Sequence, residues 1–176
     1  MNTGDLLCDL VTKFHERGPF VGGLYNAYEK AVHYGLATEA LRAGYLETDQ
    51  ELPIGRTREK CDVVLKGNDT EVWIEVKQWW FLYEPYHDWT LEKYKNSILS
   101  DWDKLRHLKN APRAVMLLRT WDATEESKKE ADAWLGDIAA KLEHKGGIHA
   151  TRDLKHCTFV RTVRYDFRGD VHVWWA

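Results

Sequence analysis

The sequence predicts an α/β protein in which helices flank one central mixed β-sheet. Segments with helical and extended periodicity follow one another as two helices, three strands, a helix, a strand, a helix and two strands. Residues 63–65 and 72–74 are continuous apolar runs, which suit a sheet covered on both faces. The chain has 176 residues, of which 44% are hydrophobic, so we expect a single domain spanning 1–176.

The helices are predicted from apolar residues at helical spacing and from glycine or proline at their ends. They are expected at about 4–17, 24–43 and 91–108, with a fourth whose apolar stripe runs from 131 to 142. The strands are predicted from apolar and β-branched runs bounded by turn residues. They are expected at about 46–54, 61–66, 71–78, 114–118, 157–165 and 171–175. The last two strands are expected to form a C-terminal hairpin across a turn at 166–170.

Three charged residues, Asp62, Glu75 and Lys77, stand at strand positions beside the apolar runs. Residues i and i+2 of a strand point to the same face, so Glu75 and Lys77 project together. The turn at 67–69 folds the two strands back, which can bring Asp62 alongside them. Such a group can hold a divalent cation and steady a water near it. Solvated strand ends, or a salt bridge from Lys77, are the simpler interpretation.

At these residues the sequence resembles the PD-(D/E)xK nuclease superfamily, whose fold is called restriction-endonuclease-like. The resemblance consists of Asp62, twelve further residues and then Glu75-Val76-Lys77, and it covers roughly residues 24–120. Cys61 replaces the proline of the family motif. The resemblance implies a core of a helix, three strands, a helix and a strand. This chain adds an N-terminal helix and the C-terminal hairpin to that core.

The resemblance implies a metal-dependent nuclease that hydrolyses phosphodiester bonds, with DNA as the expected nucleic-acid substrate. It implies Mg²⁺, or alternatively Mn²⁺, held by Asp62, Glu75 and the backbone carbonyl of Val76. Oxygen ligands of this kind favour these ions over zinc. Lys77 is expected to orient the attacking water or to stabilise the transition state.

The superfamily often adds a carboxylate from the helix that precedes the motif, and Glu29 and Glu39 are the candidates. They lie ten positions apart, or about 15 Å along a helix axis, so only one can serve. The spacing to Asp62 favours Glu29, which we place with the catalytic residues; the alternative is that both lie on the surface. His33 lies one turn beyond Glu29 and could reach the same cleft, although an ordinary helix position is the simpler interpretation.

Two other functions compete with this one. The first is a non-catalytic module that keeps the fold and binds nucleic acid or protein, and the second is an RNA nuclease. The net charge of −3 excludes a protein that coats nucleic acid through bulk positive charge, so the basic residues must be concentrated locally. Two groups are candidates for phosphate contacts: Arg56, Arg58, Lys60 and Lys66, and Arg161, Arg164 and Arg168. For each group, a solvated strand edge protected by charge is the alternative.

Location and assembly are predicted from simpler features. No apolar run is long enough to span a bilayer, and the first residues do not resemble a signal peptide. Three scattered cysteines suggest a reduced setting, so a cytoplasmic protein is expected.

One chain carries one cleavage centre, so cutting both strands of a duplex suggests a twofold homodimer. The aromatic loop 79–89 and the tail at Trp174-Trp175 are its candidate surfaces, and burial of these residues in the core is the alternative.

Overall fold

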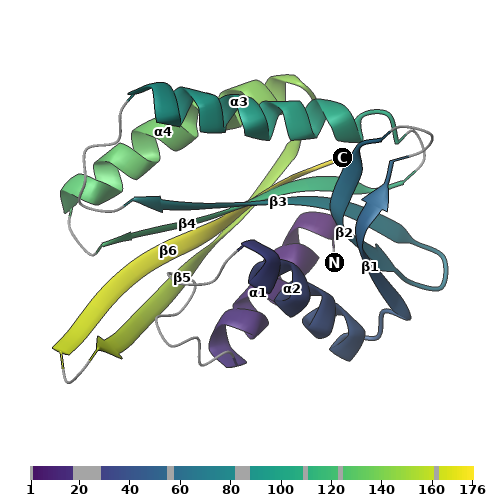
Figure 1. The fold of residues 1–176 in the computed structure, drawn as a ribbon, viewed down its shortest axis with the longest axis horizontal. Coiled ribbons are helices and arrows are strands. Elements are labelled where there is room, and N and C mark those ends of the chain that lie inside the picture. Colours follow the sequence, from purple (N-terminus) through teal and green to yellow (C-terminus); the bar gives the residue numbers. More distant parts are fainter. Residues whose placement is uncertain are drawn as a thin grey trace.

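The computed structural model describes residues 2–17, 29–54, 58–81, 88–108, 111–122, 125–160 and 163–176. A six-stranded sheet lies between two pairs of helices, α1 with α2 on one face and α3 with α4 on the other (Figure 1). The predicted α/β class and central mixed sheet are therefore confirmed. None of the helices in the described ranges is long and apolar enough to cross a membrane.

The helices and strands follow the predicted order. The helices are α1 (Thr3–Arg17), α2 (Glu29–Arg42), α3 (Asp88–Leu105) and α4 (Glu125–His144). The strands are β1 (Glu47–Pro53), β2 (Lys60–Lys66), β3 (Glu71–Phe81), β4 (Arg113–Asp122), β5 (Ile148–Val160) and β6 (Val163–Trp175). The second helix was predicted to begin at about 24, but residues 24–28 lie outside the described residues.

The sheet has the strand order β1-β2-β3-β4-β6-β5. Strands β3 and β4 are parallel, whereas the other four neighbouring pairs are antiparallel. Parallel neighbours need a crossover connection, and α3 lies in the connection between β3 and β4. This helix buries Ile98, Trp102 and Leu105 at positions i, i+4 and i+7, so one face of α3 is fixed against the sheet.

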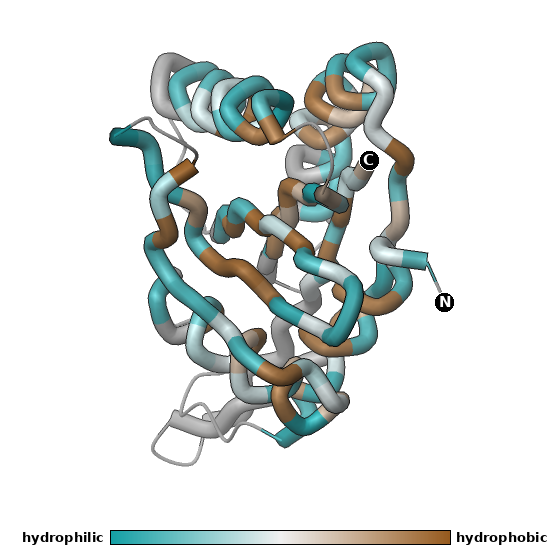
Figure 2. Tube along the Cα trace, turned by 90° about the vertical axis from the view of Figure 1, so that its right-hand side faces the viewer, coloured by the Kyte–Doolittle hydropathy of each residue, from teal (hydrophilic) through white to brown (hydrophobic). Residues whose placement is uncertain are grey.

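Two hydrophobic cores lie on opposite faces of the sheet, because successive strand residues point to opposite sides. Ile74 and Met116 belong to the core beneath α1 and α2, whereas Trp73 and Val115 belong to the core beneath α3 and α4. Figure 2 shows hydrophobic stretches along the central strands and mixed hydropathy along the helices. The sheet is therefore stabilised from both sides, at roughly 1.5–3 kcal/mol for each fully buried aliphatic side chain.

The C-terminal hairpin is present, but the predictions of its first strand at 157–165 and of its turn at 166–170 were wrong. Strands β5 and β6 pair from Val160↔Val163 to Ile148↔Trp175, so 166–170 lies inside β6. Gly169 has Leu154 of β5 on one side and Thr120 of β4 on the other. Cross-strand pairing on both sides overrides the turn preference of an Asp- and Gly-containing segment, because β-structure depends strongly on neighbouring strands.

Replacing glycine by alanine is expected to have opposite effects on stability at two helical positions, Gly35 and Gly136. A Cβ added to Gly35 in α2 would lie 2.1 Å from a ring carbon of Phe14, whereas a Cβ at Gly136 in α4 would meet nothing within 4 Å. We expect Gly35→Ala to destabilise the protein by about 1–3 kcal/mol through overpacking. Gly136→Ala should stabilise it by up to about 1 kcal/mol, because alanine favours the helix. Urea unfolding measures both changes, and a gain in stability from Gly35→Ala would contradict this packing.

Candidate functional site

The strands β2 and β3 separate at the predicted motif. Their regular pairing runs from Lys66↔Glu71 to Val63↔Ile74. Beyond it, the side chain of Asp62 meets the backbone of β3, because its Oδ2 accepts a 2.8 Å hydrogen bond from the Val76 amide. The N–H and C=O of one strand residue point to the same side of the strand. The carbonyl of Val76 therefore also points towards the side of β3 where Asp62 lies.

Glu75 is a buried carboxylate, with 1% of its side chain exposed. Its Oε1 lies 2.6 Å from the Nζ of Lys104 in α3. Burial raises the pKa of Glu75 to about 8, and the nearby charge of Asp62 adds to this, while Lys104 opposes it. Because this pKa lies above neutrality even with Lys104 beside the carboxylate, the ionised form of Glu75 at pH 7 needs further positive charge.

Lys77, the lysine of the motif, pairs with a carboxylate of α3. The Nζ of Lys77 lies 3.0 Å from Oδ2 of Asp101, and each of these side chains is 15% exposed. The other oxygen of Asp101 lies 3.4 Å from the Nζ of Lys104. Lys104 also donates a 2.9 Å hydrogen bond to the carbonyl of Lys60 at the start of β2. The two lysines thus converge on one aspartate, and Lys104 also lies next to Glu75.

A histidine from α2 reaches Asp62 from the other face of the sheet. The side chain of His33 is 4% exposed, and its Nε2 lies 4.0 Å from Oδ2 of Asp62. This nitrogen makes no hydrogen bond within the described part of the chain. Burial lowers the pKa of His33, although the charge of Asp62 opposes the change, so the ring is neutral at pH 7. His33 therefore lies near Asp62, and its role in function stays a prediction.

Glu29 and Glu39, the two candidates for a helix carboxylate at the motif, differ in what the structure shows of them. Glu29 begins α2, but its side chain lies outside the described residues, so its role stays a prediction. Glu39 is buried and pairs with Arg42 and, at 3.7 Å, with Arg17. It also lies six positions after His33, about 9 Å further along the axis and on another side of the helix. Glu39 is therefore neutralised by arginines rather than directed towards Asp62.

The predicted residues Asp62, Glu75 and Lys77 do come together, but the sequence reasoning missed Asp101 and Lys104. A signal was present for Asp101, because it lies three residues after Ile98 and four before Leu105, both fully buried. A charged residue on the buried face of a helix carries a desolvation cost and needs a partner. Lys104, three residues further on, shares this side of the helix.

The oxygen atoms at this site suit a hard divalent cation. The donors are the carboxylates of Asp62 and Glu75 together with the carbonyl of Val76, and Mg²⁺ prefers oxygen ligands. A divalent ion would offset the same unfavourable burial of Glu75 that raises its pKa. Among the described residues, no group of three or more His, Cys, Asp or Glu side chains is placed to hold a metal. The third donor would therefore be the backbone carbonyl.

The basic groups predicted to bind phosphate are partly engaged in ion pairs. Lys66 pairs with Asp49 across the β1–β2 edge, and Lys60 lies 3.7 Å from Glu51. Arg58 is exposed. The remaining members lie outside the described residues, either entirely or by their side chains: Arg56, Arg161, Arg164 and Arg168. Phosphate binding by either group stays a prediction.

Of the tryptophans assigned to a dimer surface, Trp79 and Trp174 are buried, so that assignment was wrong for these two. Trp174 is fully buried and Trp79 is 7% exposed, while Trp175 is half-buried. Trp79 stacks on Trp134, with ring centroids 5.4 Å apart. A large aromatic side chain gains most by burial in the core. Residues 82–87 of the aromatic loop lie outside the described residues, and the homodimer itself stays a prediction.

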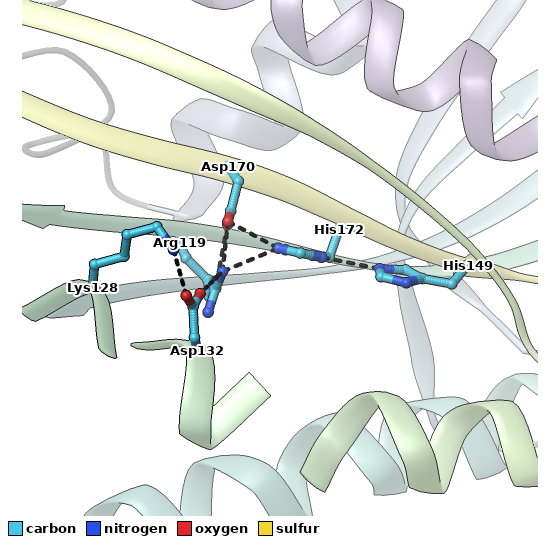
Figure 3. A network of polar contacts seen from close by, with 6 residues as sticks. All are labelled: Arg119, Lys128, Asp132, His149, Asp170 and His172. Carbon is cyan, nitrogen blue, oxygen red and sulfur yellow. Dashed lines mark hydrogen bonds and ion pairs between the residues drawn. The ribbon is translucent and has the colours of Figure 1, made fainter. Parts of the chain in front are cut away.

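A separate polar network, which contains none of the motif residues, lies between the sheet and α4 (Figure 3). Its members come from β4, β5, β6 and α4, and they are Arg119, Lys128, Asp132, His149, Asp170 and His172. Arg119 is fully buried and donates from Nε to Asp170 over 2.9 Å, with a second bond from Nη2. His172 lies 3.0 Å from Asp170 and 2.9 Å from His149. Burial alone would raise the pKa of Asp170, but hydrogen bonds from His172 and Arg119 lower it.

The motif residues and the Arg119 network thus form two separate polar groups on the sheet, and they differ in how their charges are paired. In the Arg119 network each buried charge has an opposite partner in a bidentate or chained arrangement, which suits a structural role. At the motif, the carboxylates of Asp62 and Glu75 approach each other closely enough to affect the pKa of Glu75. Two adjacent carboxylates suit cation binding. Comparison with protein-family models, curated proteins and solved structures finds no match to this chain.

Proposed function

We propose that this chain is a Mg²⁺-dependent nuclease that hydrolyses phosphodiester bonds, with DNA as its substrate. The observation that carries the proposal is the convergence of Asp62, Glu75 and Lys77 where β2 and β3 separate. The order α2-β1-β2-β3-α3-β4 agrees with the order that the PD-(D/E)xK resemblance implies, and this supports a restriction-endonuclease-like core.

Phosphodiester hydrolysis requires a nucleophilic water, compensation of the charge that builds on the phosphate, and help for the leaving oxygen. Asp62, Glu75 and the Val76 carbonyl would hold Mg²⁺ or Mn²⁺. When bound, the ion supplies positive charge for the phosphate and makes a nearby water more acidic. Lys77 donates hydrogen bonds to the attacking water or to a phosphate oxygen. Its neighbouring carboxylates favour the charged ammonium, which supports a positioning and electrostatic role over that of a general base.

The deciding experiment offers the purified protein four substrates: plasmid DNA, linear duplex DNA, single-stranded DNA and RNA. Each is incubated with Mg²⁺ or Mn²⁺, with EDTA, and with Lys77→Ala in place of the wild type. The proposal expects cation-dependent cleavage of DNA that the variant largely loses. Cleavage of RNA alone would favour the RNA nuclease, whereas binding of DNA without cleavage would favour the non-catalytic binding module.

The cation site makes a separate prediction that does not depend on turnover. Isothermal calorimetry should detect divalent-ion binding by the wild type, and Asp62→Ala and Glu75→Ala should each abolish it, because each removes a charged oxygen donor. Asp69→Ala, in the exposed β2–β3 turn, is the matched control and should bind normally. EDTA should inhibit without unfolding the protein, since both hydrophobic cores are independent of the ion. Binding that survives in both site variants would place the ion elsewhere.

One observation favours a non-catalytic nucleic-acid or protein-binding module as the second candidate. Lys104 lies against Glu75, and Asp101 lies against Lys77, so motif charges are paired within the chain. Such pairing is also what a purely structural ion network requires. The substrate experiment above distinguishes the two functions, because a nucleic-acid-binding module binds the substrate but yields no cleavage product with Mg²⁺ or Mn²⁺.

A further inference from the structure

The ammonium of Lys77 is held by a residue from another element. A lysine side chain has a flexible four-carbon stem, so it loses considerable conformational entropy when its ammonium group is fixed. Catalytic groups nevertheless need defined positions, because small displacements are costly in rate. Lys77 lies 3.0 Å from Asp101, and only 15% of either side chain is exposed. This partly buried ion pair is therefore suited to restrict the position of the ammonium.

Asp101 is itself firmly placed. The residue next to it, Trp102, is fully buried, as are Ile98 and Leu105 one turn to either side. These contacts anchor α3 on the sheet, so the carboxylate is carried by a packed helix rather than by a loop. Its second oxygen lies 3.4 Å from Lys104, so one carboxylate meets two lysines through different oxygens.

We propose that Asp101 is a positioning residue that holds the Lys77 ammonium at the candidate active site. The inference rests on the proposed function. A divalent ion at Asp62 and Glu75 would occupy those carboxylates and repel a nearby ammonium. Among the described residues, Asp101 is a carboxylate that contacts Lys77 and is not one of the proposed ion-binding donors. It keeps Lys77 in place while the ion is bound.

A double-mutant cycle tests whether Asp101 acts through Lys77. Asp101→Asn should lower kcat by about 10–100-fold, the scale typical of residues that orient active groups, with substrate KM and calorimetric ion affinity nearly unchanged. In the Lys77→Ala background, Asp101→Asn should cause no further loss, because the group that it positions is absent. The same fold-loss in both backgrounds would overturn the proposal. Asp103→Asn is the control, since Asp103 is exposed and pairs with Lys145 and Arg106.

A second measurement is independent of catalysis. In protein labelled with ¹³C at lysine Cε, NMR relaxation reports the order of each side-chain end. Asp101→Asn should lower the order parameter of Lys77 markedly. Lys104 should remain ordered, because Glu75 at 2.6 Å and the Lys60 carbonyl at 2.9 Å still hold it.

The two measurements separate this inference from the proposed function. An unchanged order parameter for Lys77 would overturn the inference, whether or not the protein cleaves DNA. If the wild type cleaves no nucleic acid, the proposed function fails, and a catalytic positioning role fails with it. A loss of Lys77 order in that case would identify the contact as purely structural. Asp103→Asn should change neither lysine.

Discussion

Replacing Lys77 by alanine is expected to reduce DNA cleavage by about two orders of magnitude or more, the scale seen when one positioned electrostatic or proton-transfer group is lost. The reason is chemical rather than structural. Lys77 is not an ion ligand, so calorimetric ion binding and substrate affinity should be largely kept. Folding should also be kept, because Asp101 retains its approach to Lys104 at 3.4 Å. Single-turnover cleavage, with ion titration and thermal unfolding of the same samples, measures all four properties.

Two further variants make this test specific. Lys77→Arg should not restore full activity, because a planar guanidinium cannot replace a compact ammonium that is fitted between neighbours. Lys93→Ala removes an exposed lysine of α3 and should cleave normally. If the wild type is inactive with Mg²⁺ and Mn²⁺, and Lys77→Ala changes only affinity, the binding module replaces the nuclease as the function of this chain.

Replacing Arg119 by methionine is expected to lower the free energy of unfolding by about 3–5 kcal/mol, the cost of leaving one member of a buried ion pair without its partner. Arg119 and Asp170 are 1% and 8% exposed, and two hydrogen bonds join them. Methionine keeps much of the side-chain volume, so the loss should come mainly from the charge. Urea unfolding at neutral pH measures the change.

The pH dependence of this effect has a definite sign. Hydrogen bonds from His172 and Arg119 hold the folded-state pKa of Asp170 below its ordinary value, despite burial. A lowered folded pKa gives stability that is fully present above the unfolded pKa of about 3.9 and is lost as pH falls through the folded pKa. The difference between wild type and Arg119→Met should therefore be largest near neutrality and shrink in acid as Asp170 becomes protonated.

An exposed ion pair of α4 provides the control for this prediction. Lys128 and Asp132 lie 2.6 Å apart, but their side chains are 44% and 46% exposed. Lys128→Met should cost no more than about 1 kcal/mol, because solvent screens such pairs. If Arg119→Met and Lys128→Met cost the same, burial is not what makes the Arg119–Asp170 pair important.

Features that depend on residues close together in the chain could be predicted from the amino-acid sequence. Helical spacing of Ile98, Trp102 and Leu105 predicted α3, and all three are buried as such a pattern requires. The turn after Lys66 predicted the β2–β3 hairpin, and the i, i+2 spacing predicted that Glu75 and Lys77 share a face. These features could be predicted because backbone periodicity and turn chemistry are local properties.

Contacts between separate helices and strands became evident from the folded structure. Periodicity tells which face of α3 is buried but not what that face contacts, so the approach of Asp101 to Lys77 and of Lys104 to Glu75 could not be predicted. The same holds for Asp170, which looks like a turn residue until β6 is paired with β4 and placed beside Arg119. The physical reason is that charged side chains acquire partners through the register and burial of the whole sheet, which depend on contacts between residues far apart in the chain.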